Sequence, residues 1–241
     1  MNITRIGTLS AAYLLHRRDF SNSSLLVECF TERQGRFPAI VKGVKGRGKS
    51  ASGLLQPFIP LQVEWSGRGE IKSLTHYEAD GRVLQLTGQA LFCGFYVNEL
   101  LMRLLQRNDP HEKLFYLYQQ LLGRLAGSGV DEVALRYFEL DMLNELGYGI
   151  DLSVESQQGD LIVAEKWYQF VQESGLIACS RDSLHATSGR ALLSLNLRTL
   201  GEPGELREIR NFLRSVLGFY IGDKPLKSRE LFRSAYRDPY T

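Results

Sequence analysis

The sequence predicts an α+β fold, with a five-stranded β-barrel of the oligonucleotide-binding type over residues 1–80 and a helical bundle domain over residues 81–241. Two patterns indicate this division. Before residue 80, short runs rich in apolar and β-branched residues alternate with glycine-containing turns, and five such strands in about seventy residues suit a small closed barrel. After Asp80-Gly81 the apolar residues take the spacing of buried helices.

Turn residues set the expected strand boundaries. The polar stretch 31–35 ends in a glycine, and residues 66–69 form a tight turn with two glycines. Pro38, Pro57 and Pro60 fall at strand starts or edges, where a missing backbone N–H is tolerated. The expected strands span residues 10–17, 24–31, 36–44, 62–65 and 70–77.

Helix signals follow from residue 88 onward. Crowded apolar residues predict a buried helix over 88–105. Asp109-Pro110 predicts a cap and a first-turn proline for a second helix that runs to Leu125, and a third helix is expected from Asp131 until Gly147.

The last third of the chain changes character twice. Residues 151–182 are more polar and predict a small inserted subdomain, with a hairpin around Ser174-Gly175. Helical patterns return over residues 189–200 and 205–221. A short basic helix is then expected after Pro225.

The densest charge lies in a glycine-rich loop between the third and fourth expected strands. Residues 42–50 hold four cations and three glycines with no acidic residue. Residues 1–80 contain eleven Lys and Arg against seven Asp and Glu, whereas the formal charge of the whole chain is only +2. Such a local excess on a small barrel is typical of a surface that contacts nucleic-acid phosphates. The expected phosphate-binding residues are Arg36, Lys42, Lys45, Arg47, Lys49 and Arg68.

Other interpretations of these residues remain open. Residues 43–50 match the phosphate-loop pattern of nucleotide hydrolases, but that loop needs a helix beginning at Lys49, and Gly53 with two nearby prolines opposes one. The basic loop is alternatively a solvated loop without a ligand. A further alternative is that the protein is an interaction scaffold that uses the helical bundle alone. Phe37 and Trp65 offer stacking faces for bases, although each is better explained as core.

The sequence contains no pattern of catalytic or metal-binding residues. The four histidines are isolated, and Cys29, Cys93 and Cys179 lie far apart without metal-ligand spacing. Acidic residues such as Glu99, Glu139 and Asp141 are interpreted as solvated faces or local ion pairs. With no targeting signal and no apolar run long enough for a bilayer, we expect a cytoplasmic, non-enzymatic protein without a cofactor, a metal or a membrane contact.

Six stretches, in the same order and across essentially the whole chain, resemble the bacterial RecO recombination mediators. They read Leu-Leu-His-Arg at 14–17 with Ser-Ser-Leu at 23–25, Gly-Leu-Leu-Gln-Pro-Phe-Ile-Pro-Leu at 53–61, Gly-Arg-Gly-Glu at 67–70, Tyr-Val-Asn-Glu-Leu-Leu at 96–101, Leu-Arg-Tyr-Phe-Glu-Leu at 135–140 with Leu-Gly-Tyr-Gly at 146–149, and Lys-Pro-Leu-Lys-Ser-Arg-Glu-Leu at 224–231. The resemblance implies an oligonucleotide-binding barrel and a helical domain without a catalytic centre. It also implies binding of single- and double-stranded DNA, annealing of complementary strands, and work with RecR to load RecA onto DNA covered by single-stranded DNA-binding protein (SSB).

The resemblance also implies where partners bind. In the family the C-terminal tail of SSB docks on the helical domain, so Arg136 is assigned to the carboxylates of that tail, and Phe138 or nearby leucines are assigned to an apolar pocket. The alternative for Arg136 is an ion pair with Glu132 or Glu139. The basic residues Lys224, Lys227 and Arg229 are left open between DNA, RecR and the protein's own fold.

One departure from the family concerns zinc. Some members carry a four-cysteine zinc site in the region that corresponds to residues 151–180, where this sequence keeps only Cys179. Zinc is therefore expected to be absent, and packing alone is expected to stabilise the inserted subdomain.

Overall fold

A computed structural model describes residues 9–44, 53–81, 83–222 and 224–230. The chain divides into two compact units. The described parts of residues 9–130, together with 226–230, form the first unit, which contains the barrel and the helices α2 and α3; residues 131–225 form the second. The domain boundary at residue 80 stays a prediction.

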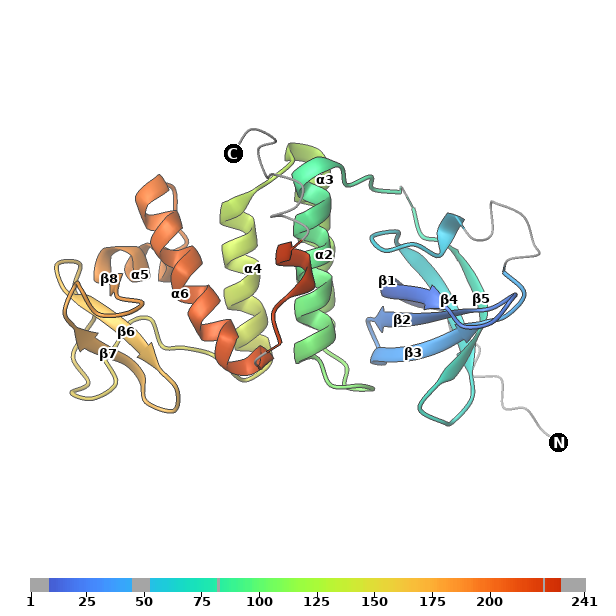
Figure 1. The fold of residues 1–241 in the computed structure, drawn as a ribbon, viewed down its shortest axis with the longest axis horizontal. Helices are drawn as coiled ribbons and strands as arrows, with labels where there is room; N and C mark the ends of the chain where they lie inside the picture. Colours follow the sequence, from blue (N-terminus) through green and yellow to red (C-terminus); the bar gives the residue numbers. More distant parts are fainter. Residues whose placement is uncertain (1–8, 45–52, 82, 223, 231–241) are drawn as a thin grey trace. The chain divides into compact units, whose positions relative to one another are not determined.

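Five strands close the barrel in the order β1-β2-β3-β5-β4, which confirms the predicted barrel (Figure 1). All neighbours are antiparallel except β3 and β5, which run parallel. Alternate apolar residues of these strands point inward and form the buried core. The strands are β1 (Ser10–Asp19), β2 (Leu25–Thr31), β3 (Gly35–Val41), β4 (Leu61–Ser66) and β5 (Lys72–Ala79).

The first half of β3 pairs with the chain that follows α2. Arg36 forms a parallel bridge with Arg107, and the Asn108 N–H donates to the Arg36 carbonyl at 2.8 Å. At Gly35 the backbone has φ +68°, and an added Cβ would overlap the Asp109 carbonyl. Only glycine therefore fits both the turn and the close approach of the two segments.

The first unit also contains the long helices α2 (Gly88–Leu104) and α3 (Glu112–Ser128). The predicted start of α3 at Asp109-Pro110 is wrong, because the helix begins at Glu112 with His111 at its N-cap position. Arg107 and Asn108 pair with Arg36 of β3, and the Asp109 carbonyl lies close to Gly35. The chain therefore still lies beside β3 at Asp109, and the helix begins after it.

Asn98 of α2 connects the helices to the barrel. Its side chain is only 2% exposed; Nδ2 donates to the Leu15 carbonyl at 2.9 Å, and Oδ1 accepts from the Tyr118 hydroxyl at 2.7 Å. Leu15 lies where the β1–β2 register shifts, between Leu14 and His16. A single buried amide thus satisfies a strand carbonyl freed by an irregularity and a hydroxyl of α3.

The second unit combines three helices with a small sheet. The helix α4 (Glu132–Glu145) begins after Asp131, at the predicted position, and the Asp131 carboxylate accepts from the Ala134 N–H at 2.8 Å as an N-cap. The sheet order is β7-β6-β8, and its β6–β7 hairpin confirms the predicted turn. The other elements are β6 (Trp167–Val171), β7 (Gly175–Cys179), β8 (Thr187–Ser188), α5 (Gly189–Asn196) and α6 (Pro203–Ile221).

Residues 151–182 are stabilised by hydrogen bonds as well as by packing, so the expectation of packing alone is corrected. The Glu155 carboxylate accepts from the backbone N–H groups of Gln157 and Gln158 at 3.0 and 2.7 Å. The Tyr168 hydroxyl accepts from the Val163 N–H at 3.0 Å. The buried apolar residues of this region include Leu152, Ile162, Tyr168 and Leu176.

Candidate nucleic-acid interface

The register of the strands brings several predicted and unpredicted residues to one end of the barrel. Asp19 pairs with Leu25, and Leu25 pairs with Val41. The end of β1, the start of β2 and the end of β3 therefore meet. The Val44 N–H donates to the Ser23 carbonyl at 2.9 Å, which holds the beginning of the basic loop against the β1–β2 turn. We call this the β1–β2 end of the barrel.

Of the predicted loop cations, Lys42 is exposed at the β1–β2 end. Lys45, Arg47 and Lys49 lie outside the described residues. The phosphate-loop interpretation falls largely on the same part of the chain; within the described part, residues 53 and 54 are helical and the chain then turns.

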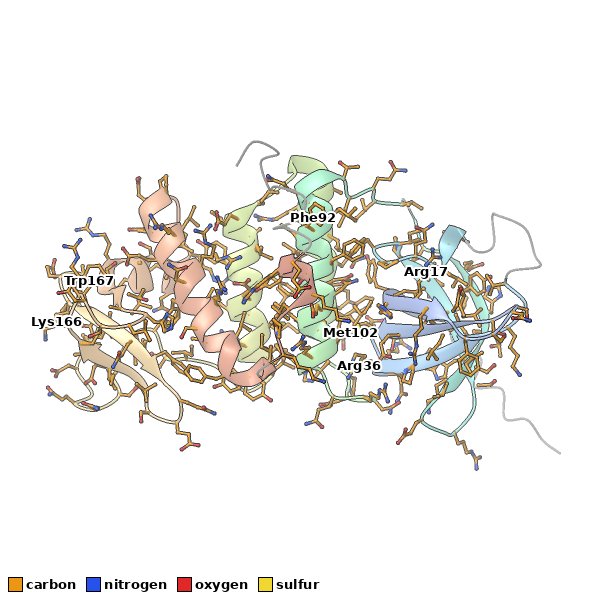
Figure 2. The ribbon with its side chains drawn as sticks, viewed as in Figure 1. Arg17, Arg36, Phe92, Met102, Lys166 and Trp167 are labelled. Carbon is orange, nitrogen blue, oxygen red and sulfur yellow. The ribbon has the colours of Figure 1, made fainter. Side chains whose placement is uncertain are left out.

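Sequence reasoning missed three exposed residues at this end. Arg17 and Arg18 are exposed at the end of β1, and the Arg17 Nη1 donates to the Leu55 carbonyl at 3.0 Å (Figure 2). Phe20, in the β1–β2 turn, is 54% exposed. For the two arginines the signal is present in the sequence, because the apolar run of β1 ends in His16, Arg17 and Arg18 before a serine-rich turn.

Arg36 has a different environment from the one predicted. Its side chain is 12% exposed, and Nε and Nη2 donate to the Leu105 carbonyl at 3.2 and 2.8 Å (Figure 2). Its Nη1 forms an ion pair with Glu28, whose carboxylate also lies 3.7 Å from Arg107. Arg36 thus connects β3 to the chain after α2, and its charge is opposed by a carboxylate rather than presented to solvent.

Arg68 is exposed but lies away from Lys42. It is in the β4–β5 turn, and the parallel register of Ala39 with Lys72 directs that turn toward the start of β3. Lys42 follows the end of β3. The two cations therefore lie at opposite ends of these strands, and the structure does not bring them together.

The two aromatic residues considered as stacking faces belong to the core. Phe37 is completely buried, and its ring centroid lies 4.9 Å from that of the half-buried Trp65. Phe37 therefore offers no open face to a base, and Trp65 packs against the core, in agreement with the interpretation favoured from the sequence.

Arg136 and Phe138 are both buried within the second unit. The Arg136 Nη1 lies 2.9 Å from the carboxylate of Glu139, which is itself buried, whereas Glu132 lies 3.5 Å from Arg210. The ion pair with Glu139 is thus present. The Arg136 Nε has no hydrogen-bond partner among the described residues.

The tail segment, residues 226–230, packs on α2 within the first unit. Leu226 is buried, and the N–H groups of Lys227 and Ser228 donate to the Glu99 carboxylate at 3.1 and 2.9 Å. The Ser228 hydroxyl donates to it at 2.8 Å, and Arg103 lies 3.1 Å away. Burial acts to raise the pKa of Glu99, but these hydrogen bonds outweigh it and lower the pKa below its ordinary value.

The tail cations are thus carried by a segment that serves the protein's own fold. The side chain of Lys227 is exposed, and the Arg229 guanidinium lies 6.0 Å from the centre of the Tyr96 ring. Lys224 is exposed just before the segment.

Among the described residues, no three His, Cys, Asp or Glu side chains are grouped so that they would hold a metal ion. In the same part of the chain, every helix is too short or too polar to cross a bilayer. Cys29 and Cys93 are buried, and burial raises the pKa of the Cys29 thiol far above its ordinary value.

A closed five-stranded barrel with cations gathered at one end, followed by a helical region, defines a protein of the oligonucleotide-binding barrel class. Family models for the N-terminal and C-terminal parts of recombination protein O match residues 7–81 and 85–230. The chain belongs to the RecO family of DNA repair proteins.

Individual relatives agree with this assignment. The DNA repair protein RecO of Methylococcus capsulatus (strain Bath) is 44% identical over 227 residues, which cover 94% of this chain and 93% of the relative. RecO proteins of Yersinia pestis and Yersinia pseudotuberculosis are 44% identical over 223 residues, with 92% of each chain covered. An asparaginyl-tRNA synthetase structure from Entamoeba histolytica aligns with 73% of this chain and 39% of the synthetase chain. Its TM-score of 0.26 and sequence identity of 12% are too low to indicate a shared fold.

Proposed function

We propose that this protein is a non-enzymatic recombination mediator that binds single- and double-stranded DNA and anneals complementary strands. With RecR, it helps to load RecA onto SSB-coated DNA in the nucleoid. Membership of a DNA repair family supports the general role. The observation that carries the DNA-binding part is the convergence of Arg17, Arg18 and Lys42, where the basic loop begins, at one end of a closed barrel.

In this proposal the cations of the β1–β2 end neutralise phosphates. Contacts to phosphates position a strand without reading its bases, which is what annealing of arbitrary sequences requires. The glycines between the loop cations let the backbone follow an irregular strand. Arg36 is left out of the contact surface because Glu28 and the Leu105 carbonyl occupy it, and Arg68 forms a separate contact at the other end of the strands.

The structure adds constraints to the proposed sites for the SSB tail, DNA and RecR. Binding of the SSB tail at Arg136 requires its guanidinium to exchange Glu139 for the carboxylates of the tail, and it requires Phe138 to become accessible. Contacts of the tail cations with DNA or RecR use side chains, because the backbone and Ser228 of the tail segment are already engaged by Glu99.

Fluorescence anisotropy of a labelled single-stranded oligonucleotide across a salt series tests the DNA-binding proposal. The slope of log affinity against log salt is about 0.7 per phosphate contact for single strands, so loss of four contacts lowers it by about 2.8. We expect this change, with weaker binding at every salt concentration, for a folded variant that lacks the loop cations. The variant is Lys42/Lys45/Arg47/Lys49→Ala.

A control variant removes the same charge from exposed positions of the second unit. It should retain the wild-type slope, because those cations lie outside the proposed interface. Equal loss in both variants would show only a response to net charge, and wild-type binding by the loop variant would place the contact elsewhere. The control is Lys166/Arg181/Arg190/Arg207→Ala.

A further inference from the structure

Phe20 is an exposed aromatic residue on the barrel. Its side chain is 54% exposed although burial of a phenylalanine is favourable. The turn that carries it is fixed by hydrogen bonds from the Phe20 and Ser21 N–H groups to the Ser24 carbonyl, at 3.1 and 3.4 Å. The ring is therefore held outside the core by a defined turn.

Two exposed cations lie at the same end of the barrel as Phe20. Arg18 precedes it by two residues and is exposed, and the exposed Lys42 follows the end of β3 at the same end of the barrel. The hydrogen bond from the Val44 N–H to the Ser23 carbonyl fixes the chain after Lys42 to the turn of Phe20. Proteins that bind single strands combine exposed aromatic rings, on which bases stack, with nearby cations that meet the phosphates.

We infer that Phe20 is a base-stacking platform, with Arg18 and Lys42 as flanking phosphate contacts, and that this end of the barrel takes single-stranded DNA through its unpaired bases. This rests on the proposed DNA binding and adds a preference to it. Stacking on a ring needs a free base face, which single strands offer and a duplex does not. It is tolerant of sequence, because every base has such a face.

The choice of oligonucleotide distinguishes base stacking on Phe20 from general phosphate binding. Three labelled probes of equal length are compared at one low salt concentration: an oligothymidine strand, a strand of abasic sites, and a duplex. The variants are Phe20→Ala, Phe20→Trp, and Ile71→Ala as a matched control. Ile71 is 48% exposed in the β4–β5 turn, at the other end of the strands. Circular dichroism melts confirm that each variant folds.

Loss of one stacked base costs about 1–3 kcal/mol, which is about 5- to 150-fold in affinity. We expect Phe20→Ala to weaken oligothymidine binding by that factor and to change abasic and duplex binding less than about 2-fold, while Phe20→Trp and Ile71→Ala bind like the wild type. If Phe20→Ala binds oligothymidine like the wild type, or loses as much affinity for the abasic strand, the stacking inference is overturned while the proposed DNA binding still stands. If the wild type binds none of the probes, the proposed DNA binding fails with it.

Discussion

Removal of the Glu99 carboxylate should release the tail segment from α2. The carboxylate accepts from the Lys227 N–H, the Ser228 N–H and the Ser228 hydroxyl at 3.1, 2.9 and 2.8 Å. It therefore caps the first amides of a helical turn, where a negative charge also meets the positive end of the helix dipole. Glu99→Ala leaves these donors without their acceptor, while Leu226 remains buried.

The size of the effect follows from these three bonds. A lost N-cap costs about 0.5–2 kcal/mol, and a hydrogen bond to a charged group contributes about 1.5–3 kcal/mol. Because one carboxylate serves all three donors, the contributions do not add, and we expect about 2–3 kcal/mol for Glu99→Ala. The population of undocked tail should then rise about 30- to 150-fold.

Hydrogen exchange of the tail amides measures this population. In Glu99→Ala, the amides of Lys227 and Ser228 should exchange faster by that factor, while strand amides of the barrel keep their wild-type protection. Glu112→Ala removes an exposed carboxylate from α3 of the same unit and is the matched control. Wild-type protection of both tail amides in Glu99→Ala would refute the assignment of Glu99 as their cap.

The pH dependence of docking has a definite sign. The pKa of Glu99 is lowered in the docked state, so its contribution is fully present above the ordinary glutamate pKa of about 4.3. It is lost as the pH falls through the lower pKa of the docked state. Protection of the tail amides, corrected for intrinsic exchange, should therefore decrease below about pH 4 in the wild type and stay flat in Glu99→Ala.

Two further substitutions test the first unit. Gly35→Ala should destabilise the protein by about 2–4 kcal/mol in urea unfolding, because the new Cβ overlaps the Asp109 carbonyl at a φ of +68°; a change below about 0.5 kcal/mol would mean that this approach is not tight. Asn98→Ala should cost about 2–4 kcal/mol in the same assay, because it leaves the Leu15 carbonyl and the Tyr118 hydroxyl unpaired in the interior. A free energy of unfolding close to the wild-type value for Asn98→Ala would contradict this explanation.

Local patterns predict elements well in this chain because they report burial. The alternation along β1–β5 and the helical spacing of apolar residues between Asp131 and Gly147 depend only on near neighbours in sequence, and the corresponding strands and the helix α4 are confirmed. The start of α3 was predicted wrongly because Asp109 and Pro110 lie beside the β2–β3 turn, more than seventy residues earlier in the chain. No local pattern contains that pairing.

The candidate site shows the same limit for charged residues. A run of cations was visible in the sequence, but the partners of each cation depend on register and on distant segments. Arg36 meets Glu28 on the neighbouring strand, and Arg68 is carried away from Lys42 by the parallel pairing of β3 with β5. Phe20 was overlooked because an isolated phenylalanine near a strand end gives no sign of its exposure.

Glu99 links two stretches that are far apart in the sequence, residues 96–101 and the tail at 224–231. The interpretation from the sequence, an acidic residue in a local ion pair, requires only Arg103 as a partner, and the ion pair between Glu99 and Arg103 is present. The same carboxylate also binds the tail segment through backbone N–H groups and Ser228. Docking therefore does not use the charged end of Lys227, whose side chain is exposed. A Lys227→Ala substitution consequently removes a cation without removing the docking contacts, so any loss of DNA or RecR binding reports on that cation itself.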